Sequence, residues 1–329
     1  MRRREFIMLV GGSAVAALPQ IALGQQQSSI RRIGVLSQGS IHNHPTPEFR
    51  AFLERLGELG WTENQNLLIE WRFSEGSDVP LARLAAELIA KNVEVIVTTP
   101  TQPTIAAKQA TSTIPIIFVQ VADPLVSGIV ANLARPDANV TGMSSLAPDI
   151  AGKRLALLKE VLPTLKRVSV LWNRPSKGSA FVLEEITAAG RSLNIEVQDI
   201  GVSEATEFDR AFDAAVSNKS QAVVVVDDPV MQGHVDAVTR IAAARKLPIA
   251  SQYPQYAVGG GLMAYGANLQ SLYRRGAEYV DRILRGDKPA NLPVQQADKF
   301  TFVLNLRTAK ALNIEISPNL LARADEVIE

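Results

Sequence analysis

Short apolar runs alternate with longer amphipathic stretches along the chain from residue 31 onward. The apolar runs are rich in Val and Ile and have the length of strands that are buried on both faces of a sheet. They predict strands at residues 33–37, 67–73, 93–98, 114–119, 140–143, 168–172, 195–200, 222–226, 248–251 and 261–264. The amphipathic stretches predict helices at residues 48–59, 81–91, 105–110, 152–162, 181–193, 207–216, 235–246 and 272–284. This alternation indicates an α/β fold in which crossover helices join parallel strands.

The strand-helix units fall into two groups that meet near residue 145, with five units before it and four after it. This grouping predicts two similar, doubly wound, Rossmann-like lobes. No Gly-Ser or charged low-complexity linker separates them, so we expect short connections between lobes that touch. In doubly wound sheets, ligands bind beyond the carboxyl ends of the strands. The residues that follow the predicted strands are therefore the candidates for a site.

Composition narrows the classes of function that this fold could serve. A chain of 329 residues with 47% hydrophobic residues can bury the cores of two domains. Its 34 basic and 33 acidic residues nearly cancel, so it has no field of one sign to attract a nucleic-acid backbone. It has no cysteine, which excludes disulfides, thiolate metal sites and cysteine nucleophiles. We therefore expect no nucleic-acid partner.

The first 24 residues have the layout of an export signal. Three arginines at positions 2–4 precede an apolar stretch at residues 6–18, and small residues lie around Gly24. Arg3 and Arg4, followed by Glu5 and Phe6, match the twin-arginine pattern, although the general secretory route stays open. The apolar stretch is shorter than the roughly 20 residues that span a membrane. We expect cleavage after Gly24 and a soluble periplasmic protein without a lipid anchor.

Sequence motifs for covalent, nucleotide or metal chemistry are missing from the mature chain. It has no GxSxG, GxxxxGK[ST] or HExxH motif, and no GxGxxG follows the first strand. His42 and His44 form an H-x-H pair with no third ligand nearby, and His234 stands alone. We predict no catalytic residue, no metal and no cofactor.

Neutral polar side chains and a few aspartates follow the predicted strands instead. Hydroxyl groups and the N–H groups of helix N-termini bind carboxylates, whereas an aspartate binds an ammonium group. Such a set suits a small zwitterion, with the hydroxyls of Ser37, Thr99 and Thr101 on its carboxylate and Asp123 or Asp227 on its ammonium group. The candidate ligand-binding residues are Ser37, Gln38, Thr99, Thr101, Gln102, Asp123, Asn173, Asp227 and Tyr265.

Each of these residues also has a purely structural interpretation. Asp123 and Asp227 precede prolines closely enough to start turns or cap helices. Thr101 could cap a helix that begins near Pro103. Trp172 and Tyr265 end strands, where they could stack on a ligand or pack in the core.

Several longer segments resemble one known family. They include GELGWTENQNLLIEWR at residues 57–72, AAKQATSTIPIIF at 106–118, DPLVSGIVANLARPDANVTG at 123–142, KRLALLKEVLP at 153–163, GGLMAYG at 260–266, and the C-terminal segment from residue 299. In this order and spacing they resemble the ABC-transporter substrate-binding proteins of the TrpX-like family. The chain departs from that family in the loop TTPTQPT at residues 98–104 and in Asp137-Ala138, where relatives have glycines.

The resemblance implies a type I periplasmic binding protein with two lobes, three crossings between them and a ligand in the cleft. It places residues 25–145 and 267–299 in the N-terminal lobe, and residues 146–266 and 300–329 in the C-terminal lobe. It also implies that Thr101 is the cleft threonine after the third strand, that an Asp-Pro turn begins at Asp123, and that the second crossing opens at Tyr265. Characterised relatives are linked to aromatic amino acids.

The expected function is that of a monomeric, periplasmic substrate-binding component of an ABC importer. It would bind a small polar solute, either an amino acid, aromatic ones included, or a related carboxylate. It would deliver this ligand to a permease and an ATPase at the inner membrane. Two alternatives stay open: a receptor that feeds a sensor kinase or chemoreceptor, and an enzyme that uses Asp123 and Asp227 as an acid and base pair.

Overall fold

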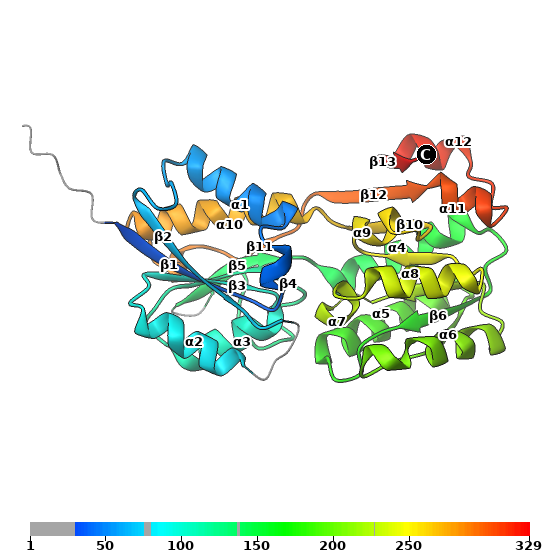
Figure 1. Cartoon of the computed structure of the whole chain (residues 1–329), viewed down its shortest axis with the longest axis horizontal. Helices are drawn as coiled ribbons and strands as arrows, with labels where there is room; N and C mark the ends of the chain where they lie inside the picture. The colour runs from blue at the N-terminus through cyan, green and yellow to red at the C-terminus, as the bar shows by residue number, and fades with distance from the viewer. Residues whose placement is uncertain (1–29, 76–79, 137–138, 227) are drawn as a thin grey trace, which may run out of the picture.

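The computed structural model describes residues 30–75, 80–136, 139–226 and 228–329. The predicted export signal and Asp227 lie outside these residues. The described chain forms two lobes that lie side by side, and each lobe has one sheet with helices on both faces (Figure 1). The two-lobed α/β fold expected from the sequence pattern is thereby confirmed.

The first lobe contains a sheet with the strand order β11-β5-β4-β3-β1-β2, in which all the recorded pairings are parallel. The order reverses between β1 and β3, which creates the switch point where doubly wound sheets bind ligands. The strands are β1 (Arg31–Ser37), β2 (Leu67–Phe73), β3 (Val95–Thr99), β4 (Ile116–Val121), β5 (Val140–Ser144) and β11 (Gln295–Gln296).

Two pairs of helices cover the faces of this sheet. The helices α1 (Pro47–Glu58) and α10 (Leu269–Leu284) pack together over one face, where Phe52, Leu56 and Val280 are buried against β1, β3 and β4. The helices α2 (Leu81–Ala90) and α3 (Thr101–Ala110) cover the other face. The sheet is therefore buried on both sides, as its apolar central strands require.

The second lobe repeats this plan with the strand order β13-β12-β10-β9-β8-β6-β7. Its switch point lies between β6 and β8, and β12 is antiparallel to β10. The strands are β6 (Arg167–Leu171), β7 (Glu196–Asp199), β8 (Ala222–Val225), β9 (Ile249–Ser251), β10 (Met263–Ala267), β12 (Phe300–Asn305) and β13 (Glu326–Ile328).

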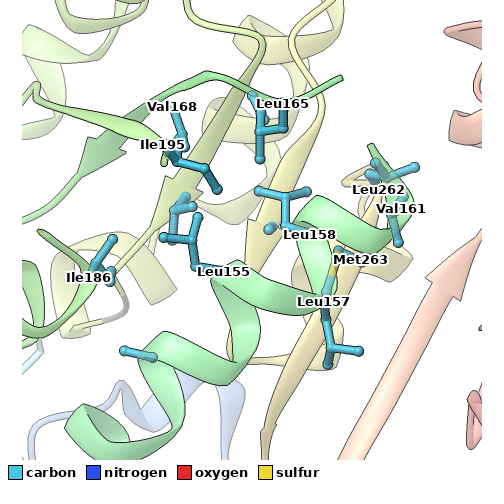
Figure 2. Close-up of a cluster of buried hydrophobic side chains, with 14 of the residues drawn as sticks. Leu155, Leu157, Leu158, Val161, Leu165, Val168, Ile186, Ile195, Leu262 and Met263 are labelled. Carbon is cyan, nitrogen blue, oxygen red and sulfur yellow. The ribbon is translucent and has the colours of Figure 1, made fainter. Parts of the chain in front are cut away.

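One of the two main buried clusters of the second lobe includes residues of α4 (Ala147–Val161) and α5 (Lys177–Leu193). Leu155 and Leu158 of α4 lie in one cluster with Val168, Ile186 and Ile195 (Figure 2). Burial of one such leucine side chain contributes about 1.5–3 kcal/mol. The remaining helices of this lobe are α6 (Phe208–Ser217), α7 (Pro229–Gln232), α8 (Val235–Ala244), α9 (Pro254–Val258), α11 (Leu306–Ala311) and α12 (Pro318–Arg323).

Three short connections join the lobes. The chain leaves the first lobe between β5 and α4, returns between β10 and α10, and leaves again between β11 and β12 (Figure 1). Because α10 belongs to the first lobe, it brings residues from late in the sequence beside α1. Residues of α10 line one side of the candidate site.

The predicted strands and helices are all present, with ends that differ by a few residues. The expectation that every strand is buried on both faces is wrong for β2 and β7, whose residues are mostly half-buried or exposed. Both strands end their sheets, so a neighbour covers them on one side alone. The apolar pattern missed β11, β12 and β13, and also the short helices α7, α9, α11 and α12.

Candidate ligand-binding site

A cavity of about 560 Å³ lies between the lobes, at the carboxyl ends of their strands. The first lobe lines it with residues after β1 and β3, with the start of α1, and with Tyr273 of α10. The second lobe lines it with the turn between α7 and α8 and with the start of α9. The volume falls within the range of about 300–1,000 Å³ that is typical of small-molecule sites.

Polar groups of the first lobe meet at the switch point. The parallel register pairs Ser37 of β1 with Thr99 of β3, so the two residues lie on the same face of the sheet. The backbone N–H of Gln38 donates to the carbonyl oxygen of Thr99 over 3.1 Å. The Oγ of Ser37 accepts from the N–H of Gly39 over 3.1 Å, so its own hydrogen can still be donated to a ligand.

Gln120 reaches this site through an irregularity in β4. The pairing of β4 with β5 shifts between Val119 and Val121, and Gln120 has a left-handed φ of 66°. Such bulges redirect a side chain and are frequent beside functional sites. The Nε2 of Gln120 donates to the hydroxyl of Tyr253, which belongs to the second lobe. Gln120 therefore bridges the two lobes directly.

Tyr273, which belongs to α10, contacts the polar groups at the switch point. Its Oη lies 2.9 Å from the Oγ1 of Thr99 and 3.3 Å from the Oε1 of Gln120. Burial raises the pKa of the Tyr273 hydroxyl above its ordinary value, despite the opposing hydrogen bond with Thr99. Tyr273 is thus a neutral hydrogen-bond donor at any physiological pH.

Aromatic rings form much of the wall. Phe49, Phe73, Tyr253, Tyr256 and Tyr273 all line the cavity. The ring of Phe49 meets that of Tyr273 edge-on, with 5.1 Å between their centroids. Since aromatic pairs favour such edge-on or offset contacts, the wall offers a surface for another ring.

Two further rings support this wall from behind. Trp71 packs edge-on against Phe49 at 5.2 Å and stacks on Phe73 at 6.0 Å. His44 lies 4.1 Å from the ring of Trp71, and burial lowers its pKa, which favours the neutral imidazole. This packing gives Trp71 a structural role and holds His44 within an aromatic cluster.

Charged groups lie at the mouth of the cavity. Glu48 and Arg50 belong to the first turn of α1, and Glu75 follows β2. Hydrogen bonds from the side chain of Ser40 and from the N–H of Ile41 lower the pKa of Glu75, so it is a carboxylate at neutral pH. Acidic and basic groups are thus both available to a zwitterion.

The cavity contains three of the residues expected from the sequence, namely Ser37, Gln38 and Thr99. Thr101, Gln102, Asp123, Asn173 and Tyr265 are not among its lining residues. Asp227 lies outside the described residues.

The residues beyond the cavity have local structural partners. The Oδ1 of Asp123 accepts from the N–H groups of Leu125 and Val126 over 2.8 and 3.0 Å, which closes a turn. Tyr265 stacks on Phe300 with 6.0 Å between their ring centroids. Asn173 pairs with Val202 in an isolated bridge.

Thr101 and Gln102 belong to the first turn of α3. The expectation that Thr101 caps a helix beginning near Pro103 is wrong, because α3 begins at Thr101 itself and Pro100 holds the capping position. The helix begins four residues before its predicted start at residue 105, so Thr101 lies in the helix and not in the loop after the strand.

Sequence reasoning missed the aromatic wall and the acidic side chains of the cavity, and it also missed Gln120, Tyr253 and Tyr273. Tyr253 lies two residues beyond β9, so the rule that sites follow strands could have found it. Gln120 was hidden because β4 extends to Val121, past its predicted end. Tyr273 belongs to a helix, and its hydrophobic pattern gave no signal of a site.

Residues 42–328 match the family model described as ABC transporter substrate binding protein. The chain belongs to this family of substrate-binding proteins. The family assignment agrees with a ligand cavity between two lobes. It confirms the resemblance noted in the sequence and the type I binding-protein fold.

Relatives of this substrate-binding protein include the Tyrosine-binding protein of Clostridioides difficile (strain R20291). The two are 26% identical over 268 residues, which are 81% of this chain and 76% of the relative. A conserved domain protein from Vibrio cholerae has a TM-score of 0.84 at 26% identity, over 91% of this chain and all of that one. A Streptococcus pneumonia ABC domain solved in complex with L-Trp has a TM-score of 0.83 at 24% identity, over the same shares, and shows the shared fold.

Two other kinds of site were sought in the part of the chain that the structure describes. It contains no group of three or more His, Asp or Glu side chains placed to hold a metal ion. Of the helices in that part, none is both long and apolar enough to cross a membrane.

Proposed function

We propose that this substrate-binding protein is the periplasmic component of an ABC importer and that its ligand is an aromatic amino acid. The observation that carries the proposal is the cavity between the lobes, where aromatic rings surround a polar end at the switch point. A relative that binds tyrosine, 26% identical over most of this chain, supports the same class of ligand.

The proposed ligand would place its ring among the aromatic side chains. Phe49 and Phe73 belong to the first lobe, whereas Tyr253 and Tyr256 belong to the second. An aromatic contact of this kind contributes about 0.5–1.5 kcal/mol beyond the burial of its area. Rings from both lobes would therefore favour a flat aromatic ligand over an aliphatic one.

The polar part of the ligand would meet the ends of β1 and β3. In this proposal, the hydroxyls of Ser37 and Thr99 and the amide of Gln38 bind the carboxylate. Glu48 or Glu75 at the mouth pairs with the ammonium group, because these are the acidic side chains that line the cavity. This assignment moves the ammonium site from Asp123, whose carboxylate already closes a turn.

Closure of the lobes would couple binding to transport. A ligand that contacts both lobes stabilises the arrangement in which they are close, by no more than its difference in affinity for the two arrangements. In the proposal, a permease and its ATPase at the inner membrane recognise the closed, monomeric protein. No covalent step is required.

Export through the twin-arginine route is part of the proposal. Changing both Arg3 and Arg4 to Lys should leave the precursor inside the cell, since that route requires the paired arginines. Fractionation followed by immunoblotting checks this. Periplasmic protein of normal abundance in the variant would favour the general secretory route.

The ligand class is tested by calorimetric titration of the mature protein, freed of bound ligand by unfolding and refolding. The panel is L-tyrosine, L-tryptophan, L-phenylalanine, L-leucine, L-aspartate and glucose. We expect binding of at least one aromatic amino acid at least tenfold tighter than L-leucine. Tighter binding of leucine, aspartate or glucose, or binding of none of the aromatic acids, would contradict the proposed ligand.

A further inference from the structure

Three hydroxyl groups contact the side-chain amide of Gln120. Its Oε1 lies 3.3 Å from the Oη of Tyr273 and 3.4 Å from the Oγ1 of Thr99, and these two hydroxyls lie 2.9 Å apart. Each hydroxyl has one hydrogen, and both can also accept. If one hydroxyl donates to the other, the second keeps a hydrogen that either the amide oxygen of Gln120 or a ligand can accept.

This arrangement leaves the amide nitrogen pointing away from Thr99 and Tyr273. The Nε2 of Gln120 donates to the hydroxyl oxygen of Tyr253. Because a hydroxyl can donate as well as accept, the hydroxyl of Tyr253 can pair with the amide of Gln120 from the side opposite Thr99 and Tyr273. The orientation seen here satisfies the contacts on both sides at once.

The contacts span the two lobes. Thr99 ends β3, Gln120 lies in β4 and Tyr273 lies in α10, all in the first lobe. Tyr253 immediately precedes α9 in the second lobe and is 7% exposed. The hydrogen bond between Gln120 and Tyr253 therefore exists only while the lobes are as close as they are in this structure.

We propose that Gln120 and Tyr253 form a clasp that stabilises the closed arrangement of the lobes before any ligand binds. Tyr273 is a positioning residue, because it acts through the amide of Gln120. The clasp is a property of the protein alone and goes beyond the proposed function. Breaking it shifts the lobes toward the open arrangement and weakens a ligand that requires closure by at most the same factor.

The distance between the lobes tests the clasp without any ligand. Because the chain has no cysteine, two introduced ones carry spin labels at unique places. Ala86→Cys in α2 and Arg240→Cys in α8 are both on exposed positions, one in each lobe. Pulsed electron-electron double resonance measures the distance between the two labels in the refolded, ligand-free, full mature chain. The populations of the short and long distances give the ratio of closed to open molecules.

Tyr253→Phe removes the hydroxyl that accepts from Gln120, and we expect the ratio of closed to open molecules to fall about fivefold, as the loss of one hydrogen bond implies. Tyr279→Phe is the matched control. It removes a hydroxyl that donates to the carbonyl of Pro293 over 2.7 Å within the first lobe, so the ratio should not change. Tyr273→Phe should lower the ratio less than Tyr253→Phe, because Thr99 can still donate to Gln120.

A double-mutant cycle separates a clasp from a general loss of order. In a Gln120→Leu background, Tyr253→Phe should change the ratio less than it does in the wild type, because the hydrogen bond between the two residues is already gone. Additive effects of Gln120→Leu and Tyr253→Phe would overturn the proposal, as would a wild-type protein that shows only the open distance. Neither result bears on which ligand the cavity binds. Equally, failure of aromatic amino acids to bind would leave this measurement intact.

Discussion

The hydroxyl oxygens of Thr99 and Tyr273 lie 2.9 Å apart, although 174 residues separate them in the chain. Thr99 ends the third strand of the first lobe, and Tyr273 returns to that lobe on α10 after the chain has built most of the second. The polar end of the cavity is therefore assembled by the topology. Its geometry depends on how the chain crosses between the lobes.

Removing the hydroxyl of Thr99 should weaken ligand binding. Thr99→Val keeps the shape of the side chain, and we expect the Kd for the tightest aromatic amino acid to rise about three- to tenfold, or about 1 kcal/mol. Titration calorimetry measures the change. Thr101→Val is the control, since Thr101 does not line the cavity. A larger loss in Thr101→Val than in Thr99→Val would place the binding hydroxyl on α3.

The aromatic wall should determine the selectivity for rings. Phe73→Leu keeps an apolar side chain but removes the ring, so the affinity for aromatic amino acids should fall about threefold to tenfold. The affinity for L-leucine should change less. Phe300→Leu is the matched control, because Phe300 is a half-buried ring that stacks on Tyr265 outside the cavity. Equal losses for aromatic and aliphatic ligands in Phe73→Leu would show that the ring is not what the site recognises.

Folding stability should fall at alkaline pH through Tyr273. Burial raises the pKa of Tyr273 in the folded protein, whereas the unfolded chain has a tyrosine pKa of about 10. Below about pH 9 both states keep the proton and the free energy of unfolding is unaffected. Above about pH 10 the unfolded chain loses the proton first, so stability falls by up to ~1.4 kcal/mol per pH unit.

Urea unfolding between pH 8 and pH 11 measures this slope. Tyr265 and Tyr279 also have pKa values raised by burial, so they contribute to the slope in the same direction. Tyr273→Phe should reduce the slope by the contribution of one proton at most, about 1.4 kcal/mol per pH unit, and leave the contributions of the other tyrosines unchanged. An unchanged alkaline slope in that variant would contradict the burial of Tyr273.

Arg154 should be important for the stability of the second lobe. It is fully buried in α4, where its Nε donates to the carbonyl of Tyr265 over 2.9 Å and its Nη2 to the Oε1 of Gln252 over 3.3 Å. Arg154→Met would remove both charged donors and leave the buried acceptors without them. We expect the free energy of unfolding to fall by about 2–4 kcal/mol.

The control for Arg154 is an exposed arginine of the same lobe. The side chain of Arg174 is 44% exposed and forms an ion pair with Glu207. Arg174→Met removes this pair and should lower the free energy of unfolding by less than about 1 kcal/mol. Urea unfolding compares the two variants. Similar losses in both would mean that the contacts of Arg154 add little beyond those of a surface pair.

The fold followed from the sequence because Val- and Ile-rich runs and amphipathic stretches report strands and helices directly. The sequence pattern did not predict that β2 and β7 lie at the edges of their sheets, because these positions depend on the order of strands in each sheet. The strand β13 and the helices α11 and α12 escaped because each buries at most one residue, which is too few to show a period. Their placement is fixed by contacts with the rest of the second lobe.

The site followed only in part. Ser37 and Thr99 were expected because they end adjacent central strands, and the rule about strand ends placed them in the cavity. Thr101 was displaced by a difference of four residues in where α3 begins. Tyr273 faces Thr99 because a helix returns from the other lobe, which local periodicity does not encode.

A crystal structure of the mature protein grown with L-tyrosine or L-tryptophan tests the central claim most directly. The account predicts the amino acid between the lobes, with its ring against Phe49, Phe73 or Tyr253 and its carboxylate at the ends of β1 and β3. An amino acid bound elsewhere, or one bound in the cavity with its ring away from these side chains, would contradict it.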